Sequence, residues 1–202
     1  MTRRIAVLIS GRGSNLQSII DAVSNGTLPA TIAVVVSNKR EAPGLARAAA
    51  AGIETLFVNP KDHQGRMAYD EALVDQLRRR RVDLVCFAGF MRIVGRPFLD
   101  AYPGRMLNIH PSLLPSFPGL DAQQQALDHG VRVSGATVHF VTAGLDDGPI
   151  VSQGVVPVFE RDTVDTLSVR ILEEEHRLYP EAIRIVLDGN WRLDGRRVMR
   201  RA

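Results

Sequence analysis

The chain has 202 residues, a formal net charge of +3 and one cysteine, Cys86. This length is sufficient to bury a sizeable core in one domain or a tightly joined pair. The sequence contains no run of the roughly 18 apolar residues that a membrane span needs, and its first residues lack the pattern of a secretory signal. We therefore expect a cytoplasmic protein without a membrane partner. A lone cysteine cannot form an internal disulfide, and we expect Cys86 to be a buried apolar residue without chemistry.

The positive charge gathers in two short segments. Residues 78–81, "RRRR", are predicted to end a helix, where cations suit the helix dipole. Residues 195–201, "GRRVMRR", are predicted to form a solvated tail. Neither segment has aromatic residues between its arginines, so the stacking surfaces that single-stranded nucleic acids need are missing. We expect no nucleic-acid partner.

Short apolar runs alternate with helical patterns through the first half of the chain, as is typical of parallel strands joined by crossover helices. The predicted strands are residues 4–10, 31–37, 54–58, 83–89 and 106–110, and the predicted helices are residues 15–25, 43–51 and 66–80. Further on, residues 134–141 and 149–158 are predicted to add antiparallel strands, and residues 163–187 to form a long helix. The pattern predicts an α/β fold with a doubly wound, mostly parallel central sheet, helices on both faces and antiparallel strands added in the C-terminal half.

A glycine-containing turn, "SGRGSNL", joins the first predicted strand to the first predicted helix. Free backbone amides at such a turn can bind a phosphate, and here Gly13, Ser14 and Asn15 would supply them. A dinucleotide fingerprint would need a third glycine where Leu16 stands and an acidic residue after the second strand. NAD is therefore disfavoured, and a plain tight turn remains the alternative to a phosphate site.

The predicted strand at residues 106–110 carries Asn108 and His110 into a segment with three prolines. Ligands of open α/β sheets bind at the carboxyl ends of the strands, which is where this strand delivers the two side chains. Pro111 and Pro115 force the preceding residues toward extended geometry and would stiffen the exit. The residues therefore predict a polar site at this strand end.

Asp146 and Asp147 follow in "VTAGLDDGPI", between two predicted strands. Taken alone, the segment is predicted to be a turn, because aspartate and glycine are common in loops. Together with Asn108 and His110, however, Asp146 completes a set of amide, imidazole and carboxylate that acyl chemistry can use. The other histidines, His63, His129 and His139, are predicted to be structural.

The chain resembles the glycinamide ribonucleotide transformylase family, the folate-dependent formyltransferases of purine synthesis. The resemblance covers nearly the whole chain and rests on five segments in order: "ISGRGSNLQ", "AGFMRI", "LNIHPSLLPSFPG", "HFVTAGLDDGP" and "EEEHRLYPEAI". It implies a single formyltransferase domain, residues 1–202, with a Rossmann-like nucleotide-binding half, residues 1–105, and a catalytic and folate-binding half, residues 106–202.

The resemblance also implies roles for individual residues. The catalytic trio would be Asn108, His110 and Asp146. The nucleotide substrate would be bound by Gly13, Ser14, Asn15, Leu172, Glu173, Glu174 and Glu175. The folate would be bound by Arg66, Met91, Arg92, Ile93, Val94, Asn108, Thr142, Ala143, Gly144, Leu145 and Asp146.

The implied reaction moves the formyl group of 10-formyltetrahydrofolate to the amine of glycinamide ribonucleotide without a metal ion. Asn108 would donate a hydrogen bond to the oxyanion, and His110 would be kept charged by Asp146. Family members occur in more than one assembly, so a monomer and a homodimer both remain open. One departure from the pattern is Asp121, where many relatives place a histidine.

Other functions remain as alternatives. A formyltetrahydrofolate deformylase would use the same trio with water as the nucleophile, although we expect such an enzyme to carry a further amino-terminal domain. A methionyl-tRNA formyltransferase would carry a further carboxy-terminal RNA-binding domain. A non-catalytic nucleotide-binding module would need only the glycine turn and would leave the trio unexplained.

Overall fold

The computed structural model describes residues 2–201 of the chain. The chain forms two compact units, Met1–Leu107 and Asn108–Ala202. The predicted boundary between a nucleotide-binding half and a catalytic half lies two residues earlier. The assignment of these functions to the two halves stays a prediction.

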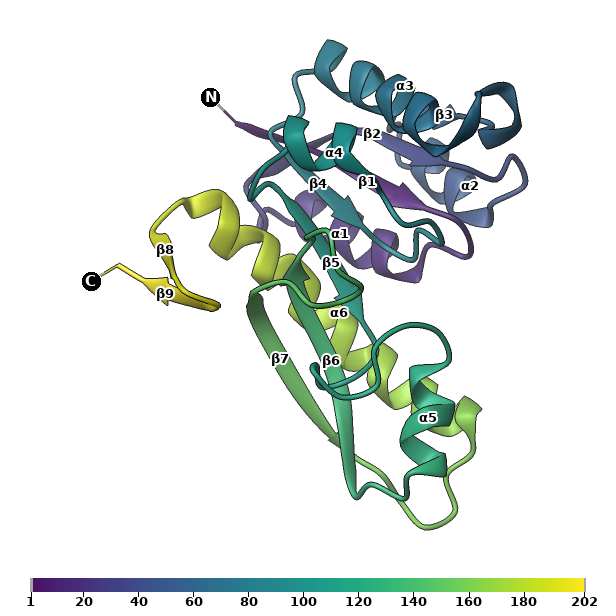
Figure 1. The fold of residues 1–202 in the computed structure, drawn as a ribbon, viewed down its shortest axis with the longest axis vertical. Coiled ribbons are helices and arrows are strands. Elements are labelled where there is room, and N and C mark those ends of the chain that lie inside the picture. Colours follow the sequence, from purple (N-terminus) through teal and green to yellow (C-terminus); the bar gives the residue numbers. More distant parts are fainter. Residues whose placement is uncertain (1, 202) are drawn as a thin grey trace. The chain divides into compact units, whose positions relative to one another are not determined.

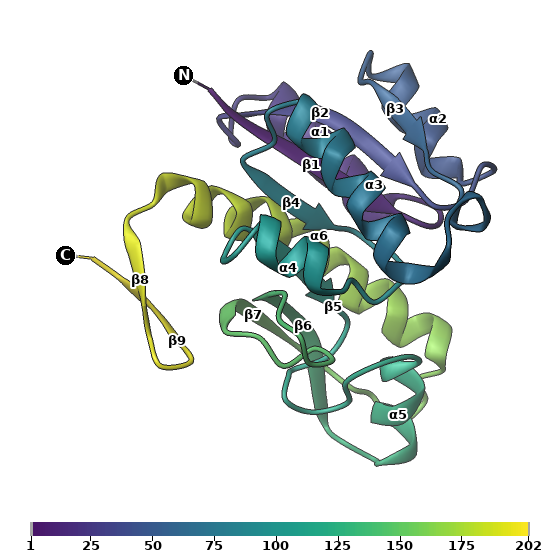
Figure 2. The same cartoon turned by 45° about the horizontal axis from the view of Figure 1, so that its top comes forward.

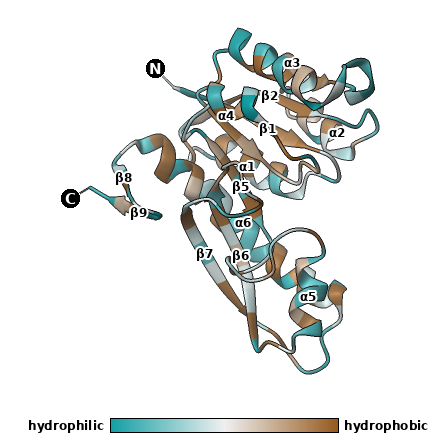
Figure 3. Ribbon diagram, in the orientation of Figure 1, coloured by the Kyte–Doolittle hydropathy of each residue, from teal (hydrophilic) through white to brown (hydrophobic). Residues whose placement is uncertain are grey.

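The first unit contains a parallel sheet in the order β3-β2-β1-β4. Its strands are β1 (Arg3–Ile9), β2 (Ala30–Ser37), β3 (Thr55–Phe57) and β4 (Leu84–Phe87). β1 and β2 are apolar over most of their length, as expected for strands that helices cover on both faces (Figure 3). Cys86, in β4, is fully buried, as predicted, and burial raises the pKa of its thiol.

Helices cover both faces of this sheet (Figures 1 and 2). One group contains α1 (Ser14–Ser24) and α2 (Pro43–Ala50), which lie against each other, and the other contains α3 (Gly65–Arg79) and α4 (Arg96–Ala101). A single 3₁₀ turn, η1 (Pro60–Asp62), precedes α3. Among the described residues, no helix is long and apolar enough to cross a membrane.

The second unit begins within β5 (Met106–His110), the strand that carries the chain out of the first unit. Its main hairpin is formed by β6 (Val133–Phe140) and β7 (Ile150–Pro157), which pair antiparallel. The 25-residue helix α6 (Val164–Asp188) packs against both strands and buries Leu167, Ile171, Leu178, Ala182 and Ile183. The short helix α5 (Ala122–Asp128) contacts α6.

The predicted fold class is confirmed, because a mostly parallel sheet with helices on both faces is followed by antiparallel strands. The sequence analysis did not predict the 3₁₀ turn η1, the short helices α4 and α5, or a second hairpin formed by β8 (Trp191–Asp194) and β9 (Arg197–Arg200). The expectation of a solvated tail at residues 195–201 is wrong, because β9 pairs with β7 as well as with β8. The arginines of residues 195–201 are exposed, as a solvated segment requires. The charge pattern therefore predicted their exposure but not the strand that carries them.

Candidate active site

β5 places Asn108 and His110 on the same face of one strand, because side chains two residues apart point the same way. His110 is buried and Asn108 half-buried. Asn108 Nδ2 lies 3.2 Å from His139 Nε2, in the neighbouring part of β6. The strand therefore presents an amide and an imidazole side by side, as predicted.

The proline segment after β5 is fixed mainly by hydrogen bonds to β6 and β7. Thr137 Oγ1 donates to the Ser112 carbonyl at 2.6 Å and accepts from the Leu114 N–H at 3.0 Å. Gln153 Nε2 donates to the Leu114 carbonyl at 2.9 Å. The segment then returns so that the Phe117 carbonyl lies 2.8 Å from His110 Nε2. These bonds, which the sequence did not reveal, orient the imidazole.

Asp146 lies in the loop between β6 and β7, in the left-handed region with φ of 49°. Its Oδ2 lies 3.4 Å from His110 Nδ1 and accepts a hydrogen bond from the Gly119 N–H at 2.9 Å. Its Oδ1 lies 3.6 Å from His139 Nε2 and 3.5 Å from Asn108 Nδ2. The structure thus brings the three residues of the predicted trio together, although their catalytic roles stay a prediction.

His139 is a fourth member of this cluster, and the sequence analysis took it for a structural residue. It is 2% exposed and lies one residue before the end of β6. Its Nδ1 lies 2.9 Å from the Phe140 carbonyl, to which it can only donate. In the neutral ring Nε2 is then an acceptor for the Asn108 amide, and when the ring is protonated Nε2 is a donor toward Asp146 Oδ1, 3.6 Å away. Strand alternation alone cannot separate such a residue from a core histidine.

Burial and charge act on His110 in opposite directions. Burial lowers the pKa of His110, the hydrogen bond to Phe117 and the charge of Asp146 raise it, and His139 lowers it again. Burial dominates, so the pKa lies below the ordinary value for histidine. In the free protein the balance of these effects therefore favours the neutral imidazole and runs against the expectation that Asp146 keeps His110 charged.

Burial raises the pKa of Asp146, but nearby groups lower it by more in total. These groups are His139, the Gly119 N–H and the His110 ring. The pKa of Asp146 therefore lies below its ordinary value, and the carboxylate is ionised at neutral pH. Both nitrogens of His110 face acceptor oxygens, so the cluster would stabilise a proton that the ring gains during a reaction.

The predicted phosphate-binding turn lies in the first unit. Gly13 adopts φ of 72° and directly precedes α1, whose first residues are Ser14 and Asn15. A Cβ atom on Gly13 would lie 2.8 Å from the Cα atom of Gly44. Both the left-handed conformation and this close approach require glycine. The first amides of α1 fit the predicted phosphate role, but the need for glycine has a structural cause as well.

The predicted folate-binding residues of the first unit lie on α3 and on the loop after β4. Arg66 is exposed near the start of α3, and Met91 and Ile93 are 65% and 60% exposed. Arg92 lies over the ring of Tyr69, 4.7 Å from its centroid. Val94 is buried and offers no side chain to a ligand.

The remaining predicted residues lie in the second unit. Thr142, Ala143, Gly144 and Leu145 precede Asp146 in the β6–β7 loop, where Leu145 is 57% exposed. Leu172, Glu173, Glu174 and Glu175 lie on α6. Glu174 pairs with Arg177 at 2.5 Å, and this hydrogen bond lowers the pKa of Glu174, whereas Glu175 is buried. The run is therefore only partly the solvated face that its charges indicate.

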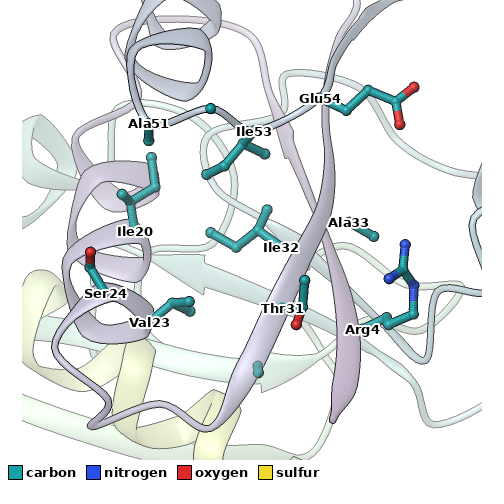
Figure 4. A pocket seen from close by; sticks show the side chains of 12 residues that line it. Arg4, Ile20, Val23, Ser24, Thr31, Ile32, Ala33, Ala51, Ile53 and Glu54 are labelled. Atoms are coloured by element: carbon teal, nitrogen blue, oxygen red, sulfur yellow. The ribbon is translucent and has the colours of Figure 1, made fainter.

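A hollow of about 430 Å³ opens on the first unit, lined by the second half of α1, the start of β2 and the segment before β3 (Figure 4). Ile20, Val23, Ile32 and Ile53 form its apolar floor, and Arg4 and Glu54 belong to its lining. It lies at the amino-terminal end of β2, whereas ligands of such sheets bind at the carboxyl ends. It contains none of the predicted site residues.

Within residues 2–201, no group of three or more histidine, cysteine, aspartate or glutamate side chains is placed to hold a metal ion. That no metal takes part stays a prediction. The cluster can instead donate hydrogen bonds to a developing negative charge and accept a proton. These are the two needs of acyl transfer to an amine.

Comparison with known proteins agrees with this chemistry. A family model described as formyl transferase matches residues 3–183. The chain belongs to the formyl transferase family. Within this family it is 45% identical to the phosphoribosylglycinamide formyltransferase of Escherichia coli, over 96% of this chain and 95% of that protein. The resemblance found in the sequence motifs is therefore confirmed.

Two further relatives extend the comparison. The chain is 50% identical to the trifunctional purine biosynthetic protein adenosine-3 of Bos taurus, over 94% of its own length but only 19% of that protein. The chain therefore spans about a fifth of the length of this relative. The crystal structure of glycinamide ribonucleotide transformylase 1 from Symbiobacterium toebii is 55% identical, with a TM-score of 0.98, over 100% of this chain and 95% of that one.

A more distant member bears on one alternative. The crystal structure of a formyltetrahydrofolate deformylase from Pseudomonas syringae is 25% identical, with a TM-score of 0.92. This chain is fully covered in that comparison but spans 67% of the deformylase chain. The chain is less identical to this deformylase than to the formyltransferases above. This difference favours the resemblance to the transformylase family over the hydrolase alternative.

Proposed function

We propose that the chain is a phosphoribosylglycinamide formyltransferase of de novo purine biosynthesis. It transfers the formyl group of 10-formyltetrahydrofolate to the amine of glycinamide ribonucleotide, giving N-formylglycinamide ribonucleotide and tetrahydrofolate. The names of the relatives and their identity over nearly the whole chain support this substrate pair. A cytoplasmic location, and a monomer or homodimer, stay predictions.

The observation that carries the proposal is the contact of Asp146 with both His110 and His139 beside Asn108. Two separate stretches of sequence, residues 108–110 and 139–146, converge there, although each has an ordinary structural explanation when taken alone. A module that only binds nucleotides has no need for a carboxylate that is only 12% exposed between two imidazoles, because withdrawing a charge from water is costly unless it is partnered.

In the proposed reaction the amine nitrogen attacks the formyl carbon, and the bond between that carbon and N10 of the folate breaks. Asn108 has one firm partner for its amide N–H groups, His139, because its 3.5 Å contact with Asp146 is long. Its second N–H is therefore available to donate to the oxyanion. Removal of such a donor costs roughly a hundredfold to a thousandfold in rate.

His110 handles the proton in this proposal. The attacking amine must lose a proton and N10 must gain one. A neutral His110 can take up the amine proton, and the imidazolium is stabilised by the Phe117 carbonyl and the Asp146 carboxylate, which face its two nitrogens. Return of the proton to N10 restores the neutral ring. The sequence analysis expected His110 to start the reaction charged, and its lowered pKa favours this revised role.

Binding of the substrates is proposed from the residues that match the family motifs. The amides of Gly13, Ser14 and Asn15, at the positive end of the α1 dipole, bind the ribose phosphate. Residues 172–175 of α6 bind the rest of the nucleotide. The folate is bound by Arg66, by residues 91–94, by Asn108 and by residues 142–146.

The test is to mix the purified protein with 10-formyltetrahydrofolate and to follow release of tetrahydrofolate with and without glycinamide ribonucleotide. We expect release that depends on the nucleotide and that yields the formylated nucleotide in equal amount. Equal release without the nucleotide would show a deformylase. If the nucleotide bound but no formyl group were transferred, the protein would be a non-catalytic nucleotide-binding module.

A further inference from the structure

The hairpin formed by β8 and β9 lies beyond residues 3–183, the part of the chain that the formyl transferase family model matches. The sequence pattern of this region indicated only a solvated basic tail. In the structure it is an ordered hairpin that turns at Gly195 with φ of 60°. The proposed reaction gives this hairpin no role, although it contacts the loop that carries Asp146.

The hairpin contacts both ends of the loop that carries Asp146, residues 141–149. The ring of Trp191 packs on the ring of Phe140, the last residue of β6, with centroids 5.0 Å apart. Arg197 pairs with Ile150, the first residue of β7. Figure 1 shows the β8–β9 hairpin beside the start of β7, where this loop ends. The hairpin thus borders both strands at the base of the loop.

A third contact reaches into the loop itself. Arg196 Nη2 donates a hydrogen bond to the carbonyl oxygen of Asp147, the residue directly after Asp146. Within the loop, the Phe140 N–H donates to the Pro149 carbonyl at 2.9 Å, and Thr142 donates to the Asp147 side chain. This hydrogen bond ties the backbone next to Asp146 to a segment outside the loop.

The hairpin is itself anchored to a rigid element. Trp191 Nε1 donates to the Val186 carbonyl in the last turns of α6 at 3.1 Å. The ends of the hairpin are joined by a hydrogen bond from the Arg201 N–H to the Asn190 carbonyl at 3.0 Å. Because α6 packs on β6 and β7, the anchor and the loop belong to the same packed body. A restraint from the hairpin is therefore transmitted to the loop.

We propose that the β8–β9 hairpin braces the 141–149 loop and that Arg196 is a positioning residue for Asp146. The role of Asp146 in this proposal rests on the proposed function. The contacts of Asp146 with the two imidazoles, at 3.4 and 3.6 Å, are long enough that a small displacement would break them. A displacement of about 1 Å in such a site can cost up to a hundredfold in rate.

The test compares Arg196→Ala with Arg192→Ala, which removes the same charge from an exposed position of the same hairpin. For Arg196→Ala we expect kcat to fall about tenfold or more with little change in the Michaelis constant for the nucleotide. Arg192→Ala should behave as the parent protein. Equal kcat for all three proteins would overturn the proposal.

A second measurement does not depend on activity. NMR titration of His110 reports its distance from Asp146, because the carboxylate raises the pKa of the ring. If the brace loosens, Asp146 withdraws and the pKa of His110 falls. Loss of the positive charge of Arg196 alone would raise the pKa of His110. The direction of the shift therefore distinguishes a loosened brace from a simple loss of charge. An unchanged or raised value in Arg196→Ala would contradict the brace even if the protein proved to be no formyltransferase.

Packing of Trp191 gives an independent variant. Trp191→Phe keeps an aromatic ring against Phe140 but loses the bond to Val186, whereas Trp191→Ala loses both. We expect the alanine variant to show the larger fall in kcat and the same shift of the His110 titration as Arg196→Ala. If both variants fold, as circular dichroism would show, and both keep the parent kcat, the hairpin does not brace the loop.

Discussion

His139 Nε2 lies 3.2 Å from Asn108 Nδ2, while its Nδ1 lies 2.9 Å from the Phe140 carbonyl. The carbonyl fixes the proton on Nδ1, so the neutral ring offers Nε2 as an acceptor to the amide of Asn108. This orients the amide with its N–H groups toward the site. A donor that is held in place before the reaction is what stabilisation of an oxyanion requires.

We therefore predict that His139→Phe lowers kcat about tenfold to a hundredfold, since Asn108 would lose its orientation. An N–H of Asn108 and the Phe140 carbonyl would lose their partner, which costs about 1–3 kcal/mol of unfolding free energy for each group that stays shielded from water. His139→Gln, which can place an oxygen near the position of Nε2, is the matched control and should recover part of kcat. Steady-state kinetics and urea unfolding measure both effects. Parent-like kcat in His139→Phe would contradict the orienting role.

Asp146→Asn is predicted to lower kcat by about a hundredfold or more while both substrates still bind. The substitution keeps the size of the side chain and deletes the charge that would stabilise a protonated His110. An interaction needed mainly in the transition state affects kcat more than the Michaelis constants. His110→Asn should be similarly slow, and the double variant hardly slower, because residues that act as a unit are not additive. If the loss of kcat in the double variant equalled the product of the two single losses, His110 and Asp146 would not act as a unit.

The lowered pKa of His110 predicts a specific pH dependence. If the neutral ring is the active form, kcat/KM should be constant near neutral pH and fall only below the ordinary histidine value of about 6.5. The stability of the fold should follow the same direction. The unfolded chain binds a proton more readily than the folded His110, so stability is full above about pH 6.5 and decreases as the pH falls through this range. Asp146, whose pKa is also lowered, adds a further loss at more acid pH, below about 3.9.

A pH–rate profile and urea unfolding at several pH values test this paired expectation. The matched control is His110→Asn, in which the acid-side loss of stability near pH 6 should be smaller. Activity that decreases from acid toward neutral pH would show that the imidazolium is the active form, as the sequence analysis first expected.

The sequence was sufficient to predict the fold class and the convergence of Asn108, His110 and Asp146. Those predictions depend on periodicity and on the rule that strand ends carry the site, which are local or topological properties. His139 was missed because its role depends on which atoms surround it, and the alternation of a strand carries no such information. The sign of the shift at His110 was missed for the same reason, since burial can be judged only in three dimensions.

Gly13 shows a different limit. The sequence predicted that the backbone amide of Gly13 helps to bind a phosphate, with a plain tight turn as the alternative. The structure adds a left-handed conformation and the close approach of Gly44, either of which requires glycine without any ligand. A substitution at Gly13 therefore cannot separate the phosphate site from a plain turn. The β8–β9 hairpin was missed because charge patterning describes solvation and does not reveal which strand edge a segment pairs with.

The loop after β4 allows a separate test of folate binding. Arg92 stacks on Tyr69, whose ring is fully buried, and the next residue of α3, Asp70, accepts a hydrogen bond from the Gly95 N–H at 2.6 Å. Two adjacent residues of α3 thus hold the loop that is proposed to bind the folate. Burial raises the pKa of Tyr69 to about 12, so the ring stays uncharged beneath the guanidinium.

We predict that Tyr69→Leu raises the Michaelis constant for 10-formyltetrahydrofolate about twofold to thirtyfold, since a cation–π contact is worth about 0.5–2 kcal/mol. The constant for glycinamide ribonucleotide and kcat should change little. Tyr69→Phe is the matched control, because it keeps the ring, and among the described residues the Tyr69 hydroxyl has no hydrogen-bond partner. It should bind folate as the parent does and be no less stable. Equal weakening in Tyr69→Phe and Tyr69→Leu would show that the ring does not support Arg92. Unchanged folate binding in both would remove this loop from the proposed folate site, while the cluster around Asp146 would remain.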